Sequence, residues 1–400
     1  MRTSVASRSI PASPTLSIDA KAKAMAASGI NVISLGTGEP DFPTPAVIVE
    51  AAAQALLQGH HKYTPVSGTP RLKASIREYT LARTGISFPD NQIIASCGAK
   101  HSLYNMWLAL LDPGDEVLIP TPAWVSYITQ VEMAGGRPVE VPGNPARAFA
   151  PDIEALEAAL TPKTRAILIN NPSNPTGALW TREHLEPLAD WLATHPELVI
   201  ISDAIYSELV YDGQTYHELL AMRPEFRDRY VLINGASKAF AMTGWRLGYT
   251  CAPVELIAAM DRMQSQSTSN PTAITQFAAA LAFEAGESII APMREKFERR
   301  RDHMVALLNA IEGVTLVTPQ GAFYAFPDFS AFLGRATPEG QVLATDMELA
   351  AWLLESAHVA VVPGSAFSAP GYVRMSYATS EEVLTEAVGR ISRALATLTR

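Results

Sequence analysis

Apolar positions between residues 46 and 285 follow two alternating patterns. Helical periodicity, stopped by glycine, marks PAVIVEAAAQALLQG (45–59) and TPRLKASIREYTLARTG (69–85). Further helices are expected over 99–111, 125–134, 153–160 and within 181–194. Between them lie short, mostly apolar runs: QIIAS, EVLIP, RPVEV, TRAILIN, LVIIS, YVLIN and LGYTC. Such runs predict strands covered on both faces, and therefore an α/β domain with a mostly parallel sheet between helices, which we place at residues 46–285.

The pattern changes after residue 285. A long helical stretch (288–311) precedes two predicted strands, VTLVT (314–318) and AFYAF (322–326). A helix over 346–356, the strands VAVVPG and YVRMSYA, and a helix from Ser380 follow. This mixture predicts a smaller α+β domain of residues 286–400, with the segment 1–45 packed against it. The active site would then lie in the cleft between the two domains.

Composition narrows the class of protein. The chain has 400 residues, 48% of them hydrophobic, which is enough for about two buried cores. Its net charge is −9, and its one basic cluster, KFERRR (296–301), lies on a helix where a solvated face explains it. We therefore expect no nucleic-acid partner.

The location of the protein is predicted from two features of the sequence. The chain contains two cysteines, Cys97 and Cys251, without a pairing pattern, which indicates a reducing compartment. No apolar run reaches the about 18 residues that cross a bilayer. We expect a cytoplasmic protein without a membrane partner.

Candidate chemistry gathers at the ends of predicted strands, where open α/β sheets bind ligands. The loops are ASCGAK (95–100), NNPSNPTG (170–177), SDAIY (202–206) and NGASKAF (234–240). Gly98 lets the backbone approach a ligand at a helix N-terminus suited to phosphate, although most glycines of this kind merely form a tight strand-to-helix turn. Asn174 could donate a hydrogen bond into the cleft.

Three charged residues in these apolar surroundings call for partners. Asp203 ends a buried strand, and an isolated buried carboxylate is costly, so it pairs either with a cation or with a protonated ring nitrogen. Lys238 lies among Ala, Phe and Met, and Arg246 follows it in another apolar setting. An electron-sink cofactor needs such a set: a lysine for a Schiff base, an acid at the pyridinium nitrogen and an arginine for the phosphate.

Several motifs in order resemble one family. SKAFAMTGWRLGY (237–249), with NNPSNPTG, SDAIY and GTGEPDFPTP, is similar to the class I and II aminotransferases of pyridoxal 5′-phosphate (PLP) fold type I. The resemblance is closest to the prokaryotic aspartate aminotransferases and extends from Ser13 to VRMSYATSEE near the C-terminus. It implies a PLP-dependent enzyme with a large domain, a small domain and a dimeric active unit.

The resemblance assigns roles around the cofactor. Lys238 would carry PLP as a Schiff base and act as the catalytic base and acid, and Asp203 would pair with the ring nitrogen. Asn174 and Tyr206 would hydrogen-bond the phenolic oxygen, and Trp124 would stack on the ring. The phosphate would be bound from two loops and across a dimer: by the backbone of Gly98, Ala99 and Lys100, by Ser237 and Arg246, and by Tyr63 of the partner subunit.

The same resemblance assigns the substrate side. Arg374 would grip the α-carboxylate bidentately, a task suited to its planar fork, and Gly38 would add a backbone contact. Trp124 and Asn174 would border the substrate, and Lys100 would meet its distal carboxylate. Ala204 and Gly235 depart from the family pattern. Many relatives carry Glu at the first position, without mechanistic consequence here, and some carry a phosphate-binding serine at the second.

The sequence also bears on alternative functions. The histidines form no metal-ligand spacing, so no metal site is predicted, and no G-x-G-x-x-G opens a βαβ unit, which disfavours a nicotinamide enzyme. A PLP-dependent lyase shares the lysine, aspartate and arginine and stays open. A PLP-sensing regulator would need an attached DNA-binding module. The predicted reaction is ping-pong transamination between aspartate and 2-oxoglutarate, with prephenate or aromatic substrates as the alternative. SQSTSNP (265–271) contains no arginine, so we expect no arginine-based pocket for an acidic side chain from this loop.

Overall fold

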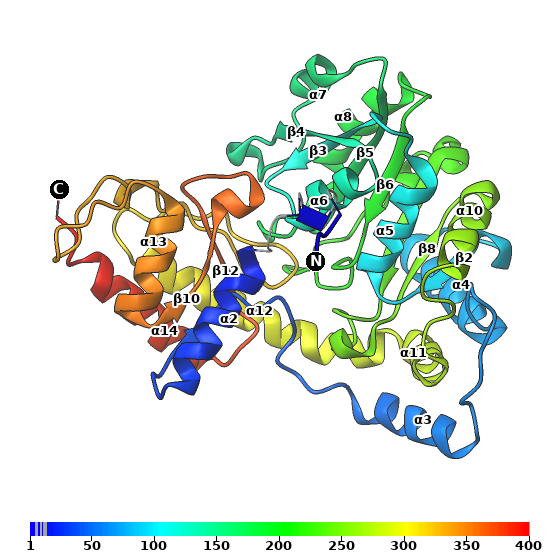
Figure 1. Cartoon of the computed structure of the whole chain (residues 1–400), viewed down its shortest axis with the longest axis horizontal. Helices are drawn as coiled ribbons and strands as arrows, with labels where there is room; N and C mark the ends of the chain where they lie inside the picture. Colours follow the sequence, from blue (N-terminus) through cyan, green and yellow to red (C-terminus); the bar gives the residue numbers. More distant parts are fainter. Residues whose placement is uncertain (5–6, 9, 11–13, 400) are drawn as a thin grey trace.

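The computed structural model describes residues 1–4, 7–8, 10 and 14–399, so Ser13, where the family-like sequence begins, lies outside the described residues. A seven-stranded sheet in the order β2-β8-β7-β6-β5-β3-β4 forms its centre (Figure 1). Within this sheet β8 is antiparallel to both neighbours, and the other paired strands are parallel. The bounds are β2 (Ile93–Ser96), β3 (Glu116–Thr121), β4 (Arg137–Pro142), β5 (Thr164–Asn170), β6 (Val199–Asp203), β7 (Tyr230–Gly235) and β8 (Gly248–Cys251).

Helices cover both faces of this sheet, which explains why its strands lack alternating polar positions. In β5, Ile167 and Ile169 pack into one core, while Ala166 and Leu168 pack into the other. The predicted mixed α/β class is confirmed, and the helices α10 and α11 are additions to the prediction. The helices of this part are α3 (Ala46–Leu57), α4 (Pro70–Thr84), α5 (Ala99–Leu110), α6 (Ser126–Met133), α7 (Ile153–Ala159), α8 (Arg182–Ala193), α9 (Leu219–Met222), α10 (Val254–Ser265) and α11 (Ala273–Ala285).

Another hydrophobic core lies beside the two cores of this sheet, and helix α12 extends from the sheet toward it (Figure 1). Strand β1 of the N-terminal segment pairs in parallel with β10, joining Ile33 to Val359. Strands β11, β12 and β9 form a separate antiparallel sheet. The elements are α2 (Pro14–Ala27), β1 (Ile33–Ser34), α12 (Glu287–Asn309), β9 (Tyr324–Ala325), α13 (Asp346–Trp352), β10 (Val359–Ala360), β11 (Val362–Pro363), β12 (Val373–Ser376) and α14 (Glu381–Leu395).

Two strand predictions in this second part need correction. VTLVT (314–318) is not a strand, because Thr315 makes an isolated bridge to Asp328 and Pro319 then lacks the N–H that would continue a ladder. VAVVPG is divided into β10 and β11, which pair with different strands. In the described ranges, every helix is too short or too polar to span a membrane.

Candidate active site

A cavity of about 280 Å³ opens at the carboxyl ends of β5, β6 and β7. Most residues that the sequence singled out line it together: Gly38, Ala99, Lys100, Trp124, Asn174, Asp203, Tyr206, Ser237, Lys238, Arg246 and Arg374. Two do not. Gly98 lies directly behind Arg246, and the Tyr63 side chain is 92% exposed outside the cavity.

Strand register brings the inner residues together. Asn170 ends β5 opposite Asp203, the last residue of β6, and β7 ends just before Lys238. Asp203 is buried, and its carboxylate accepts hydrogen bonds from the Tyr127 hydroxyl (2.6 Å) and the Ile205 N–H (3.2 Å). Burial raises the pKa of Asp203 to about 6, although both hydrogen bonds and the nearby Lys238 lower it. Asp203 therefore carries a negative charge near neutral pH.

The Lys238 amine is buried, and its pKa is lower than that of an ordinary lysine. It donates a hydrogen bond to the Gly38 carbonyl at 2.5 Å. Burial lowers the pKa of Lys238 to about 8, with Arg374 and Arg246 acting in the same direction and Glu39 and Asp203 opposing. At pH 7 an amine with this pKa is about one tenth neutral, a much larger neutral fraction than that of an ordinary lysine, which suits an amine that acts as a nucleophile or base.

One end of the cavity is built to bind an anion. Gly98 precedes α5 with φ +89°, and a Cβ there would lie 2.4 Å from Arg246 Nη2, so only glycine leaves room for the guanidinium. Arg246 is exposed, has φ +58° and donates to the Thr243 carbonyl at 2.8 Å. The N-terminus of a twelve-residue helix beside an exposed guanidinium is a favourable site for phosphate.

The same cavity also holds a buried cation. Arg374 is 2% exposed and donates to the Asn174 side-chain oxygen (3.0 Å) and the Gly36 carbonyl (2.8 Å). In the part of the chain that the structure describes, its Nε has no hydrogen-bond partner. Burial lowers the pKa of Arg374, and neutral tyrosines rather than carboxylates surround it. Because a buried unpaired charge is costly, this arrangement indicates a place for a carboxylate ligand.

A second cation borders the cavity at the start of α5. The Lys100 amine lies 4.7 Å from the centre of the Trp124 ring. Burial, together with the charge of Arg246, lowers the pKa of Lys100. An ammonium at a helix N-terminus opposes the helix dipole, so an anionic ligand would stabilise it.

Two tyrosines of the site were missed from the sequence. Tyr127 in α6 reaches Asp203 and also meets Trp124 edge to face at 5.2 Å. Tyr324 in β9 contacts the Tyr206 hydroxyl at 2.9 Å. Tyr127 stands three positions after Trp124, about one helical turn, a spacing that could have suggested the first. No local signal indicates the second.

The fold and this cavity indicate a class of enzyme: one whose site combines a buried lysine, a buried carboxylate and a set of cations suited to an anionic ligand. Residues 30–391 match the model of the family "Aminotransferase class I and II". The chain belongs to this family and is a PLP-dependent aminotransferase, which converts amino acids and 2-oxo acids.

Known relatives cover nearly the whole chain. An aspartate aminotransferase of Rhizobium meliloti (strain 1021) is 45% identical over 386 residues, 96% of this chain and 94% of the relative. An aspartate/prephenate aminotransferase of Cereibacter sphaeroides is 46% identical over 379 residues, 95% of each chain. The crystal structure of the aspartate aminotransferase from Rhizobium meliloti superposes with a TM-score of 0.96 at 44% identity and full coverage of both chains. These neighbours confirm PLP fold type I.

The residues present fit PLP. Gly98 has no side chain, which leaves room for the Arg246 guanidinium beside the start of α5, where a phosphate would bind. The buried Asp203 carboxylate can keep a ring nitrogen protonated. Lys238 projects into the same cavity. When bound, PLP supplies an electron sink for the bonds at the substrate Cα.

Proposed function

We propose that the enzyme transfers the amino group of L-aspartate to 2-oxoglutarate in a ping-pong cycle. The observation that carries this proposal is the pair of cations in one cavity, the buried Arg374 without a carboxylate partner among the described residues and the Lys100 amine beside Trp124. Two cations suit a dicarboxylate, because each carboxylate can then be neutralised. The names of the relatives, which include aspartate and prephenate, are consistent with this choice.

At the cofactor side, we assign Lys238 to the covalent bond and Asp203 to the ring nitrogen. Tyr206 and Asn174 would hydrogen-bond the phenolic oxygen, and Trp124 would stack on the ring. The phosphate would be bound by Ser237, the Arg246 guanidinium and the N–H groups of Gly98, Ala99 and Lys100 at the start of α5.

At the substrate side, Arg374 would bind the α-carboxylate through a bidentate pair, and Gly38 would add a backbone contact. Once the amino acid has displaced it, the neutral Lys238 amine would take the proton from the substrate Cα and return it on the cofactor side. Lys100 would orient the distal carboxylate. The charged Asp203 carboxylate would keep the ring nitrogen of the cofactor protonated.

We also propose a homodimer in which Tyr63 of the partner subunit completes the phosphate site. The apolar side chains of Val47, Val49, Leu56 and Leu57 on α3 are exposed, as is Tyr63. Helix α3 lies at the outer edge of the molecule, packed on α11 (Figure 1). An exposed apolar row of this kind is typical of a protein–protein interface.

Two further assignments belong with this proposal. Residues 46–285 would form the large domain, and 1–45 with 286–400 the small one, because largely separate hydrophobic cores support these parts. A cytoplasmic location is supported by Cys97 and Cys251, which are both free thiols.

The substrate proposal is tested with single half-reactions of the PLP-loaded enzyme. Each amino acid is added alone, and the loss of the absorption band of the lysine-bound cofactor is followed. Aspartate and glutamate should bleach the band fastest, and Lys100→Ala should slow both while leaving alanine unchanged. Equal aspartate rates in Lys100→Ala and the wild type would contradict the role of Lys100. Release of ammonia and pyruvate would favour a lyase, and faster reaction with the amino acid formed from prephenate would favour the aspartate/prephenate type.

A further inference from the structure

Tyr324 contacts both Tyr206 and Arg374 in the cavity, and the roles assigned above do not use it. It is 1% exposed and lines the cavity from β9. Its hydroxyl lies 2.9 Å from the Tyr206 hydroxyl, and either group can donate. A Cβ on Gly38 would lie 3.0 Å from the same hydroxyl, so the segment that bears the Lys238 hydrogen-bond acceptor packs closely against it.

The ring of Tyr324 has a separate contact. The Arg374 guanidinium carbon lies 4.6 Å from its centre, within the range of a cation–π interaction. The two tyrosine rings meet at 80° with centres 5.8 Å apart. Tyr324 therefore contacts Tyr206 through its hydroxyl and Arg374 through its ring.

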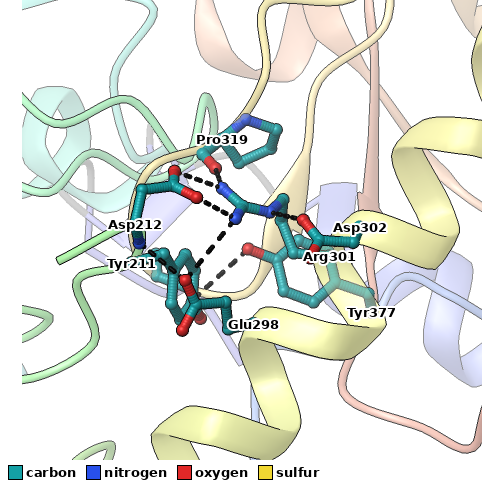
Figure 2. A network of polar contacts seen from close by, with 8 residues as sticks. Tyr211, Asp212, Glu298, Arg301, Asp302, Pro319 and Tyr377 are labelled. Atoms are coloured by element: carbon teal, nitrogen blue, oxygen red, sulfur yellow. Dashed lines mark hydrogen bonds and ion pairs between the residues drawn. The ribbon is translucent and has the colours of Figure 1, made fainter.

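A buried arginine fixes the chain that carries Tyr324 (Figure 2). Arg301 of α12 is 2% exposed and binds Asp212 through both terminal nitrogens, at 2.6 and 2.9 Å. It also donates to the Pro319 carbonyl at 2.6 Å, which holds the start of the segment 319–324. Arg301 is buried while Asp212 is 43% exposed, and the bidentate geometry of the pair fixes the orientation of the guanidinium.

The middle of the segment 319–324 is held as well. Tyr211 and Tyr377 both donate their hydroxyls to the Ala322 carbonyl, and Figure 2 shows both beside Arg301. The Ala322 N–H donates to the Leu209 carbonyl at 2.9 Å. Tyr324 thus has little freedom to leave its position between Tyr206 and Arg374.

We propose that Tyr324 is a positioning residue for both halves of the reaction, with its hydroxyl orienting Tyr206 toward the cofactor and its ring orienting Arg374 toward the substrate carboxylate. This inference rests on the proposed roles of Tyr206 and Arg374. Charged groups that face the tyrosine pair are Arg374 from β12, Asp203 from β6 and Lys238 from the loop after β7.

Two substitutions separate the two contacts. Tyr324→Phe keeps the ring and removes the hydroxyl, whereas Tyr324→Leu removes both. Each variant is loaded with PLP, and absorbance is followed against pH and, separately, against added maleate, an unreactive dicarboxylate. Tyr216→Phe is the matched control, because its hydroxyl binds Glu218 and it does not line the cavity.

The hydroxyl is tested by the pH titration. Deprotonating the cofactor joined to Lys238 leaves more negative charge on its phenolic oxygen, which Tyr206 stabilises. Without Tyr324 as its donor, Tyr206 stabilises that charge less, so the titration midpoint should rise by about half a pH unit in Tyr324→Phe. Tyr216→Phe should match the wild type. An unchanged midpoint in Tyr324→Phe would overturn the role of the hydroxyl.

The ring is tested by maleate. Tyr324→Phe should bind maleate as the wild type does, and Tyr324→Leu should bind it about tenfold more weakly because Arg374 loses its cation–π contact. Equal affinity in Tyr324→Leu and the wild type, or an equal loss in both Tyr324 variants, would overturn the role of the ring. A wild type that takes up no PLP or binds no maleate would instead overturn the proposed function.

Discussion

The active-site cavity has an inner wall, formed by Asp203, Tyr206 and Lys238, and an outer wall that contains Arg246. The two walls differ in how fully their polar groups are paired within one chain. Asp203, Tyr206 and the base of Lys238 lie among packed side chains at the strand ends, and their hydrogen-bond partners come from the same chain. At the outer wall Arg246 is exposed, and Tyr63 lies outside the cavity, exposed to solvent. The comparison supports the proposal that one chain prepares the chemistry, while Tyr63 of the partner subunit would complete the phosphate site.

The largest expected effect is at the inner wall. Lys238→Ala removes the amine that forms the covalent bond and moves the proton, so transamination should fall to background. Initial rates with aspartate and 2-oxoglutarate measure this. Lys296→Ala, an exposed lysine on α12, is the control and should retain full activity. Appreciable turnover in Lys238→Ala would remove that residue from the mechanism.

The outer wall should respond through affinity rather than chemistry. Tyr63→Phe removes one phosphate donor, so the PLP dissociation constant should rise about tenfold or more, with turnover at saturating PLP nearly unchanged. Equilibrium dialysis gives the constant.

The same substitution tests the dimer. Hybrids of Tyr63→Phe and Lys238→Ala chains contain one site with both native residues, provided that Tyr63 serves the partner. High-affinity PLP binding should therefore return in those hybrids. A mixture that behaves as the sum of its parents would contradict sharing across the interface.

A smaller effect is expected from Tyr127→Phe at the inner wall. Asp203 loses a hydrogen bond that favours its charged form, so its pKa should rise above about 6. The working form is the carboxylate, which exists above that pKa, so the acid limb of the pH–rate profile should move to higher pH by about one unit. Tyr104→Phe, on α5 outside the cavity lining, is the control. An acid limb that stays in place would show that Tyr127 does not tune Asp203.

The smallest effect concerns Glu39, an exposed carboxylate that raises the pKa of Lys238. Apoenzyme should capture PLP faster as the pH rises through about 8, because the neutral amine is the nucleophile. Glu39→Gln should lower this midpoint by a few tenths of a pH unit, an effect limited by solvent screening. Stopped-flow absorbance measures the capture rate. A midpoint that rises would contradict the sign of the interaction.

The residues of the inner wall could be predicted from the sequence, whereas the residues that hold them in place could not. Lys238 and Asp203 stand out because charged residues at the ends of apolar strands need partners, and strand order brings their loops together. Tyr324 lies more than a hundred positions from Tyr206, so their contact exists only after distant parts of the chain have come together in one core. The strand predicted for VTLVT (314–318) was wrong for a similar reason. The path of this segment depends on Pro319 and on the buried Arg301, which binds the Pro319 carbonyl.

We expect Lys238 to carry the cofactor at the inner wall, and reductive trapping identifies the modified lysine. The PLP-loaded enzyme is reduced with borohydride and digested, and the modified peptide is identified by mass spectrometry. The expected result is a pyridoxyl phosphate group on Lys238 in the peptide containing NGASKAF, and loss of this label when aspartate is added before the reduction. A label on another lysine, or a wild-type protein that takes up no PLP, would contradict it.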